Sequence, residues 1–174
     1  MIIMAIIIDG YNLMHVTRFA VGPNDRRRLD EARNSMLAFL AGHLERIGEY
    51  DVAVVFDSDR RSKLPTEQTA FGLRVLFARD YPTADDLIEE LIQTHAAPKR
   101  LTVVSSDHRI QVFAKRRKAH PVDSDVWFDQ LLEQSATTDG VGRSFEELES
   151  GASTHDSEES FENPFPEGYG EDLG

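Results

Sequence analysis

The stretch Ile6-Ile7-Ile8-Asp9-Gly10-Tyr11-Asn12-Leu13 decides the fold, because an apolar run ends there abruptly in a carboxylate, a glycine and a carboxamide. The apolar residues that begin at the N-terminus predict a buried strand over residues 1–9. In open α/β sheets, ligands bind in the crevice outside the carboxyl ends of the strands. We therefore expect Asp9 to lie at a ligand-binding edge of such a sheet.

Three further segments repeat this layout, in which carboxylates follow an apolar strand or a turn that starts a helix. They are 52–57, ending in Asp57; 81–86, ending in Asp85 and Asp86; and 101–107, ending in Asp107. If these ends share one edge of the sheet, four or five carboxylates converge on one pocket. Such a cluster is hard to keep ionised unless a divalent cation neutralises it. The pattern therefore points to a metal-dependent enzyme that acts on phosphodiesters.

The rest of the domain alternates strands with helices. Apolar residues recur every three or four positions between Asp25, a predicted N-cap, and Ile47, which predicts an amphipathic helix. Further elements are expected at 51–57 (strand), 58–72 (loop with a short helix), 73–78 (strand), from Thr83 onward (helix), 101–104 (strand), 107–117 (helix capped by Ser106), 119–122 (strand) and 124–134 (helix capped by Ser124). Such alternation predicts an α/β fold with a mainly parallel sheet covered by helices on both faces.

The chain divides into a domain, residues 1–134, and an acidic tail, residues 135–174. The formal net charge is −12, and the tail carries −10 of it, from 11 Asp or Glu and one Arg. With few aliphatic residues, the tail is expected to be disordered. Three roles are open for this tail. It is a solubilising segment, a binding segment for a protein partner, or a segment that occupies a basic groove of the domain in cis. Because the domain itself is nearly neutral, the net charge does not exclude a nucleic-acid substrate.

Several classes of protein are excluded by composition. Cysteine is absent, which excludes disulfides, thiolate catalysis and cysteine-based zinc sites. The apolar N-terminus is short and lacks a basic region and a cleavage site, so it does not have the pattern of a signal peptide. No run approaches the roughly 18–20 apolar residues of a membrane span. We expect a cytoplasmic protein without membrane association.

The acids of the predicted pocket divide by their expected roles. Asp9 and Asn12 offer oxygens to a metal ion and donors to a water or a phosphate. Asp85 and Asp86 lie in the first turn of a helix and point about 100° apart, so they serve different roles. Asp86 fits a capping box that starts at Thr83, which leaves Asp85 free for metal.

Basic residues near the strand ends are candidates for contact with an RNA phosphate backbone. They are Arg60, Arg61, Lys63 and Arg79. The neighbouring Asp57-Ser58-Asp59 is similar to the DxD element of haloacid-dehalogenase-like phosphatases. It lies on the second predicted strand, however, and lacks the threonine that normally follows that element on the first strand.

The sequence resembles the YacP-like branch of the NYN domains, which are related to PIN-domain nucleases. The resemblance rests on 8–12 (Ile-Asp-Gly-Tyr-Asn), 54–57 (Val-Val-Phe-Asp), 83–86 (Thr-Ala-Asp-Asp) and 105–107 (Ser-Ser-Asp), found in the family's order, with 31–33 (Glu-Ala-Arg) in the first long helix. It covers residues 3–134. It implies a three-layer α/β/α fold and a Mg²⁺- or Mn²⁺-dependent endoribonuclease acting on RNA, including mRNA or ribosome-associated RNA.

The resemblance also assigns roles to individual residues. Asp9, Asp85 and Asp107 become the catalytic metal ligands, and Asn12, Asp57, Asp86 and Ser106 become supporting residues of the pocket. Two departures from the family stand out. Asp86 replaces the usual Glu, and the acidic tail replaces a basic helical extension, which argues against docking to the ribosome.

Two other functions remain open from the sequence. One is an RNA-binding or ribosome-associated module that keeps the fold and cleaves nothing. The other is a phosphatase for small phosphoesters, which would form a covalent aspartyl-phosphate on Asp57. The sequence does not predict an oligomeric state.

Overall fold

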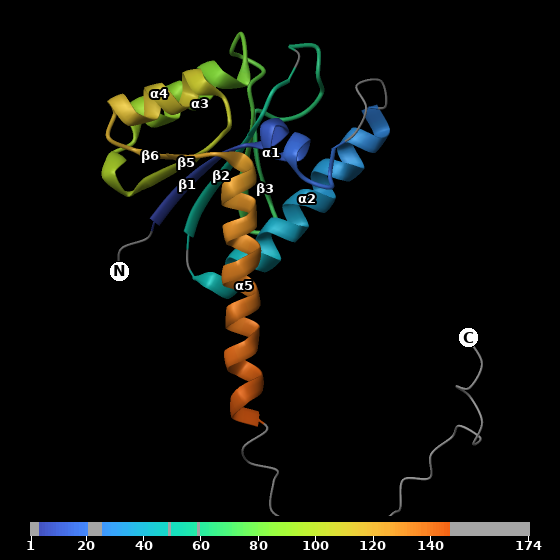
Figure 1. The fold of residues 1–174 in the computed structure, drawn as a ribbon. Coiled ribbons are helices and arrows are strands. Elements are labelled where there is room, and N and C mark those ends of the chain that lie inside the picture. Colours follow the sequence, from blue (N-terminus) through green and yellow to red (C-terminus); the bar gives the residue numbers. More distant parts are fainter. Residues whose placement is uncertain (1–3, 21–25, 49, 59, 147–174) are drawn as a thin grey trace, which may run out of the picture.

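The fold is that of a computed structural model (Figure 1), which describes residues 4–20, 26–48, 50–58 and 60–146. Side chains are described for all of these residues except 26–27 and 138–146. The elements in chain order are β1 Met4–Asp9, α1 Gly10–Val16, α2 Arg26–Ile47, β2 Tyr50–Phe56, β3 Glu67–Ala70, β4 Leu73–Phe77, α3 Ala84–Thr94, the 3₁₀ helix η1 Pro98–Arg100, β5 Leu101–Val104, α4 His108–Arg116, β6 His120–Val122 and α5 Ser124–Glu146. The predicted α/β class is confirmed.

A six-stranded sheet in the order β3-β4-β2-β1-β5-β6 forms the middle layer. All neighbouring strands are parallel except β3 and β4. The chain runs outward from β1 to β2 and β4, and then returns across β1 to β5. The sheet therefore has a topological switch point between β1 and β5, which is where open α/β sheets bind ligands.

Helices cover both faces of this sheet, each over its own apolar core (Figure 1). Alternate residues of a strand point to opposite faces, so Ile8 joins the core under α1, α2 and α5 while Ile7 joins the core under α3 and α4. Both residues are at most 5% exposed. The central strands therefore read as continuous apolar runs, and the expected three-layer arrangement is confirmed.

Helix α1 starts directly after β1 and was not expected from the sequence. Its first residue, Gly10, packs against the ring of Phe56 on β2, where an added Cβ would lie 2.4 Å from a ring carbon. Glycine is therefore required at this position for α1 to approach the sheet so closely. This close approach brings Tyr11 and Asn12 next to the carboxyl ends of the strands.

The segment 58–72 holds strand β3 instead of the predicted loop with a short helix. β3 pairs antiparallel with β4 at the edge of the sheet and joins it through Phe71 and Gly72. Both of these turn residues have positive φ, 53° and 79°, as a type I′ hairpin requires. A β-branched or aromatic residue rarely adopts this conformation, so Phe71 hides the turn from a sequence pattern.

The helix ends also differ from the predictions. Asp107, not Ser106, is the N-cap of α4, because its Oδ1 accepts the backbone N–H groups of Arg109 (2.7 Å) and Ile110 (3.3 Å). Helix α5 begins at Ser124 and continues to Glu146, well past the expected end at residue 134. The predicted cap Asp25 and the tail from residue 147 lie outside the described residues. None of the described helices is long and apolar enough to cross a membrane.

Candidate active site

Asp9 ends β1 at the switch point and is 9% exposed. Its Oδ1 accepts the backbone N–H of Asn12 (3.1 Å), which caps α1, and its Oδ2 accepts the hydroxyl of Ser105 (3.2 Å). The pKa of Asp9 is raised from the ordinary 3.8 to about 6, mainly by burial and also by the charges of Asp85 and Asp107, while the hydrogen bonds from Asn12 and Ser105 act in the opposite direction. Without a cation, Asp9 is therefore partly protonated near neutral pH.

Ser105 connects Asp9 to Asp107. Its hydroxyl is buried, donates to Asp9 and accepts the backbone N–H of Asp107 (3.1 Å). Sequence reasoning did not include Ser105 in the site. The available signal was its place directly after the buried strand β5, where the side chain must face either the core or the pocket.

Asn12 ties three segments together with one oxygen. Its Oδ1 accepts the backbone N–H of Ser106 (2.9 Å) and the hydroxyl of Ser124 (2.7 Å). The hydroxyl of Ser106 in turn accepts the backbone N–H of Ser124 (3.1 Å). Asn12 and Ser106 thus fix the start of α1 to the loop before α4 and to the start of α5. Ser124 was predicted to cap the last helix, but it is the first residue of α5, and its hydrogen bond to Asn12 was missed.

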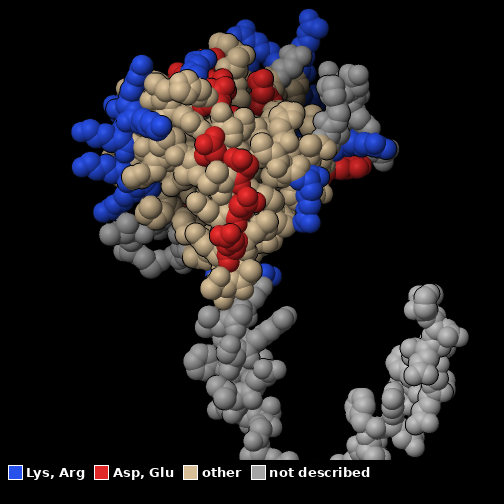
Figure 2. All heavy atoms as spheres, viewed as in Figure 1, with Lys and Arg blue, Asp and Glu red and all other residues tan. Residues whose placement is uncertain are grey.

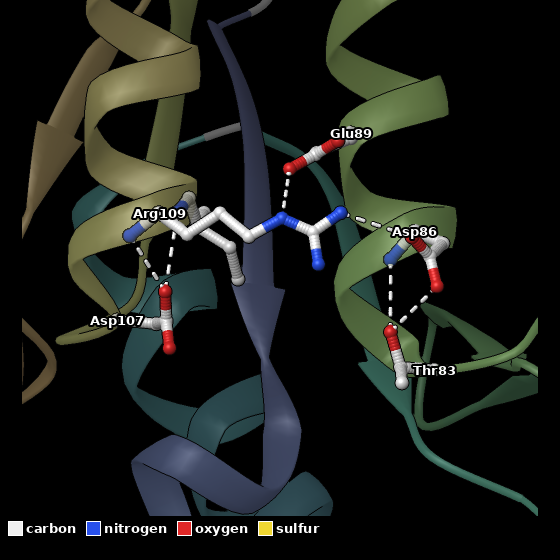
Figure 3. A network of polar contacts seen from close by, with 6 residues as sticks. Thr83, Asp86, Glu89, Asp107 and Arg109 are labelled. Atoms are coloured by element: carbon white, nitrogen blue, oxygen red, sulfur yellow. Dashed lines mark hydrogen bonds and ion pairs between the residues drawn. The ribbon is translucent and has the colours of Figure 1, made fainter.

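Asp86 belongs to the predicted capping box at the start of α3. Thr83 donates its hydroxyl to Asp86 Oδ2 (2.8 Å) and accepts the backbone N–H of Asp86 (3.3 Å). Arg109 reaches across from α4, donating Nη2 to Asp86 (3.0 Å) and Nε to Glu89 (2.7 Å), as Figure 3 shows. The hydrogen bonds from Thr83 and then Arg109 hold the pKa of Asp86 below its ordinary value.

Asp85 has no hydrogen bond to any residue that the structure describes. Partial burial raises its pKa, and so does the charge of Asp107, while Arg109 acts in the opposite direction. Arg109, another residue that sequence reasoning missed, therefore engages Asp86 and Glu89 by direct ion pairs and leaves Asp85 as the free acid of α3.

Asp9, Asp85 and Asp107 thus interact electrostatically at the carboxyl edge of the sheet. Within the described ranges, however, no three His, Cys, Asp or Glu side chains lie close enough together to hold a metal ion directly. The available donors are all oxygens, and Mg²⁺ usually keeps several waters and takes only one or two carboxylates. The free carboxylate of Asp85 and the oxygen of Asp107 that does not cap α4 fit such a hydrated ion.

Asp57 lies apart from these three acids, on the other side of the strand ends. It is exposed, its Oδ1 accepts the backbone N–H of Ser58 (2.9 Å), and it lines a cavity together with Tyr11 and Lys63. Arg61 lines the same cavity, and Arg60 is exposed beside it. The structure therefore divides the predicted site residues into two neighbouring groups.

Arg79 makes its hydrogen bond to the backbone inside the domain. Its guanidinium donates Nη1 to the backbone carbonyl of Leu64 (2.8 Å) and is half-buried, with a buried Nε that has no hydrogen-bond partner within the described part of the chain. It therefore supports the segment between β2 and β3. An RNA contact by Arg79 stays a prediction that this geometry does not favour.

Charged side chains are unevenly distributed over the surface (Figure 2). Acidic residues form a stripe along α5, where Asp125, Asp129 and Glu133 recur every fourth residue and are exposed. Basic residues gather at the end of α4, with Lys115 and Arg116 in its last turn. A polyanion is repelled by the α5 face and meets more favourable charge elsewhere on the domain.

Comparison with known proteins agrees with this architecture. The family model of the YacP-like NYN domain matches residues 6–162. A crystal structure of Rae1 (YacP) from Bacillus subtilis superimposes with a TM-score of 0.53 and 24% identity, covering 86% of this chain and 83% of that one. A mutant of the same protein gives a TM-score of 0.57 and 22% identity, covering 86% of each chain. At this identity, these two structures show the fold alone.

No curated protein sequence matches the chain. The family model, in contrast, covers most of its length and includes all the strand ends described above. Together with the sheet order and the acids at the switch point, this match shows that the chain belongs to the YacP-like NYN domain family, which is nuclease-like.

Proposed function

We propose that this protein is a Mg²⁺- or Mn²⁺-dependent endoribonuclease that hydrolyses RNA phosphodiester bonds. The observation that carries the proposal is the buried carboxylate of Asp9, whose pKa is raised to about 6 next to Asp85 and Asp107. A buried acid with a strongly raised pKa at the ligand-binding edge of a sheet marks a functional site. Family membership supports nuclease chemistry at that site.

Each residue has a distinct role in the proposed reaction. Asp85 and Asp107, with Asp9 behind them, would hold the divalent ion through carboxylate oxygens and its waters. A bound divalent ion supplies an activated water and stabilises charge on the scissile phosphate. Ser105 and Asn12 position the carboxylates and the strand ends, and Arg109 keeps Asp86 and Glu89 engaged outside the cluster. The products would carry a 5′-phosphate.

The substrate class within this proposal is RNA in the cytoplasm, either mRNA or RNA bound to the ribosome. The exposed Arg60, Arg61 and Lys63 beside the strand ends would contact its phosphates.

The test is cleavage of a panel of single-stranded and structured RNAs by the full chain and by Asp85→Asn, each with Mg²⁺, with Mn²⁺ and with EDTA. The expected result is cutting that requires metal and is lost in the variant. Asp51→Asn is the matched control, because it removes an exposed acid at the start of β2, at the opposite end of the sheet. Cutting that survives both EDTA and Asp85→Asn would contradict the proposal.

One observation favours the competing function, an RNA-binding module without cleavage. It is that no three metal-binding side chains in the described ranges lie close enough to hold an ion directly. The same panel separates the two functions, since such a module would bind RNA and cut none of it under any condition.

A further inference from the structure

The cavity lined by Asp57 lies at the same edge of the sheet as the other acids, on the side of β1 that faces β2. This cavity has a volume of about 590 Å³, and its walls come from Tyr11 on α1, from α2 and from the segment that follows β2. Cavities of about 300–1,000 Å³ accommodate small organic ligands. Because Tyr11 follows Asp9 by two residues, a ligand in this cavity would sit next to the proposed cleavage site.

The back of the cavity is rigid. Arg33 of α2 is 5% exposed, and its guanidinium lies over the rings of Phe56 (5.4 Å) and Phe77 (5.0 Å). Arg33 Nη1 donates to the hydroxyl of Tyr11 (3.3 Å), and its Nη2 forms an ion pair with Asp30. The ring of Tyr11 also packs edge-on against Phe56, with centroids 5.1 Å apart. Tyr11 is therefore a fixed aromatic wall.

Ser58, Asp57 and Lys63 line the cavity and keep hydrogen-bonding capacity that no described residue uses. The hydroxyl oxygen of Ser58 is buried and has no hydrogen-bond partner in the described part of the chain. Asp57 beside it is exposed, and among the described residues it accepts a hydrogen bond at Oδ1 alone, from the backbone N–H of Ser58. Lys63 is exposed at the rim, without an ion pair to any described residue. A buried polar atom without a partner is costly, so these groups are suited to a ligand with complementary polar groups.

We propose that this cavity is the selectivity pocket of the nuclease and binds one unpaired nucleotide of the substrate RNA, with the base against Tyr11 and a phosphate against Lys63. The inference rests on the proposed function. Unpaired bases are recognised by stacking on aromatic side chains and by hydrogen bonds to their edges, and lysine binds phosphate as a point charge. Tyr11, Ser58, Asp57 and Lys63 supply these elements in one place.

Asp57 determines which of the four bases the pocket should prefer. Its free carboxylate oxygen accepts a hydrogen bond and cannot donate one. Adenine, cytosine and guanine each present an amino group on the pairing edge, whereas uracil presents two carbonyl oxygens around a single N–H. Those oxygens repel a carboxylate. The pocket should therefore disfavour uracil.

Binding measured without cleavage tests the pocket directly. Fluorescence anisotropy of labelled single-stranded A, C and U octamers with the full chain, in EDTA and again with Ca²⁺, gives the affinities. We expect the U octamer to bind about five-fold more weakly or worse than the A and C octamers, as a base-edge contact of this kind discriminates. Asp57→Asn should abolish the discrimination against uracil, because the carboxamide oxygen stays on the N–H of Ser58 and the amino group then donates to the base edge.

Lys63→Ala should weaken all three octamers alike and lower the slope of log affinity against log salt by about one. Asp51→Asn and Lys99→Ala are matched controls, since both residues are exposed and lie away from the cavity. They should leave the discrimination against uracil unchanged. Discrimination that persists in Asp57→Asn, equal affinities in the wild type, or no binding at all would each overturn the inference.

The proposed nucleotide pocket and the proposed nuclease activity can be refuted independently of each other. Metal-dependent cutting with equal affinity for the three octamers would refute the pocket and leave the nuclease standing. Asp57-dependent discrimination without any cutting would support the pocket and refute the nuclease.

Discussion

Replacing Asp9 by asparagine should stabilise the protein at neutral pH while abolishing RNA cleavage. Asp9 is 9% exposed, and its pKa is raised from 3.8 to about 6, mainly by burial. Each pH unit between the folded and unfolded pKa is worth about 1.4 kcal/mol, so the ionised carboxylate costs the folded state about 3 kcal/mol. Asparagine keeps the size of the side chain and carries no charge into the protein interior.

Linkage between folding and protonation sets the pH dependence. Because folding raises the pKa of Asp9, its stabilising contribution is fully present below about pH 4 and is lost as the pH rises through about 6. From about pH 4.5 to about pH 8, the wild type should therefore lose about 2 kcal/mol of stability relative to Asp9→Asn. Any mismatch between the carboxamide and its partners Asn12 and Ser105 involves no titrating group and should cancel over this range.

Urea unfolding of the full chain in EDTA, at about pH 4.5 and about pH 8, measures this difference. Asp51→Asn is the control for loss of an exposed carboxylate. A difference between wild type and Asp9→Asn that stays constant with pH, or that turns against the variant at the higher pH, would refute the reasoning.

Four further predictions concern the contacts around the acids and the C-terminal part of the chain. Ser105→Ala removes a hydrogen bond that stabilises ionised Asp9, so the pKa of Asp9 should rise further. The acidic limb of the pH–rate profile for RNA cleavage should then move to higher pH, and an unchanged limb would contradict this prediction. Arg109→Gln should raise the pKa of Asp85 and shift the same profile, yet barely change the urea midpoint, because its ion pairs are exposed; a large loss of stability would count against this assignment. Ending the chain after Glu146 should tighten RNA binding in anisotropy if the acidic tail acts in cis, whereas unchanged affinity would dismiss that interaction. Ending it after residue 134 should also lower the urea midpoint, because α5 continues beyond that point and Ser135 is buried.

The elements with a strong local pattern could be predicted from the sequence. The apolar run of β1 ends in Asp9 and that of β5 is followed by Asp107, and the apolar spacing of three or four residues up to Ile47 predicts the end of α2. The box from Thr83 to Asp86 is also local, since its partners lie three residues apart. Alternation of these elements was sufficient to predict the α/β class and the edge of the sheet at which Asp9 lies.

The remaining features depend on contacts that are distant in the chain. Ser105 and Asp9 lie 96 residues apart, and Asn12 and Ser124 lie 112 residues apart, so their hydrogen bonds have no local signature. Strand β3 is polar and only four residues long, and it owes its existence to pairing with β4. Arg33 was noted in the sequence only as part of the motif 31–33, and only the fold places it over Phe56 and Phe77.

Capping alone does not account for Asp9. Its Oδ1 caps α1, but a serine or an asparagine would serve equally well, and an N-cap contributes only about 1 kcal/mol. The cost of burying the charge, about 3 kcal/mol, exceeds that gain. Asp107, in contrast, is more exposed and accepts two backbone N–H groups, so its cap is a sufficient structural reason for that acid. Because folding has no use for a charge on Asp9, the charge is explained by what the site binds, and a divalent cation is the ligand that would offset its cost.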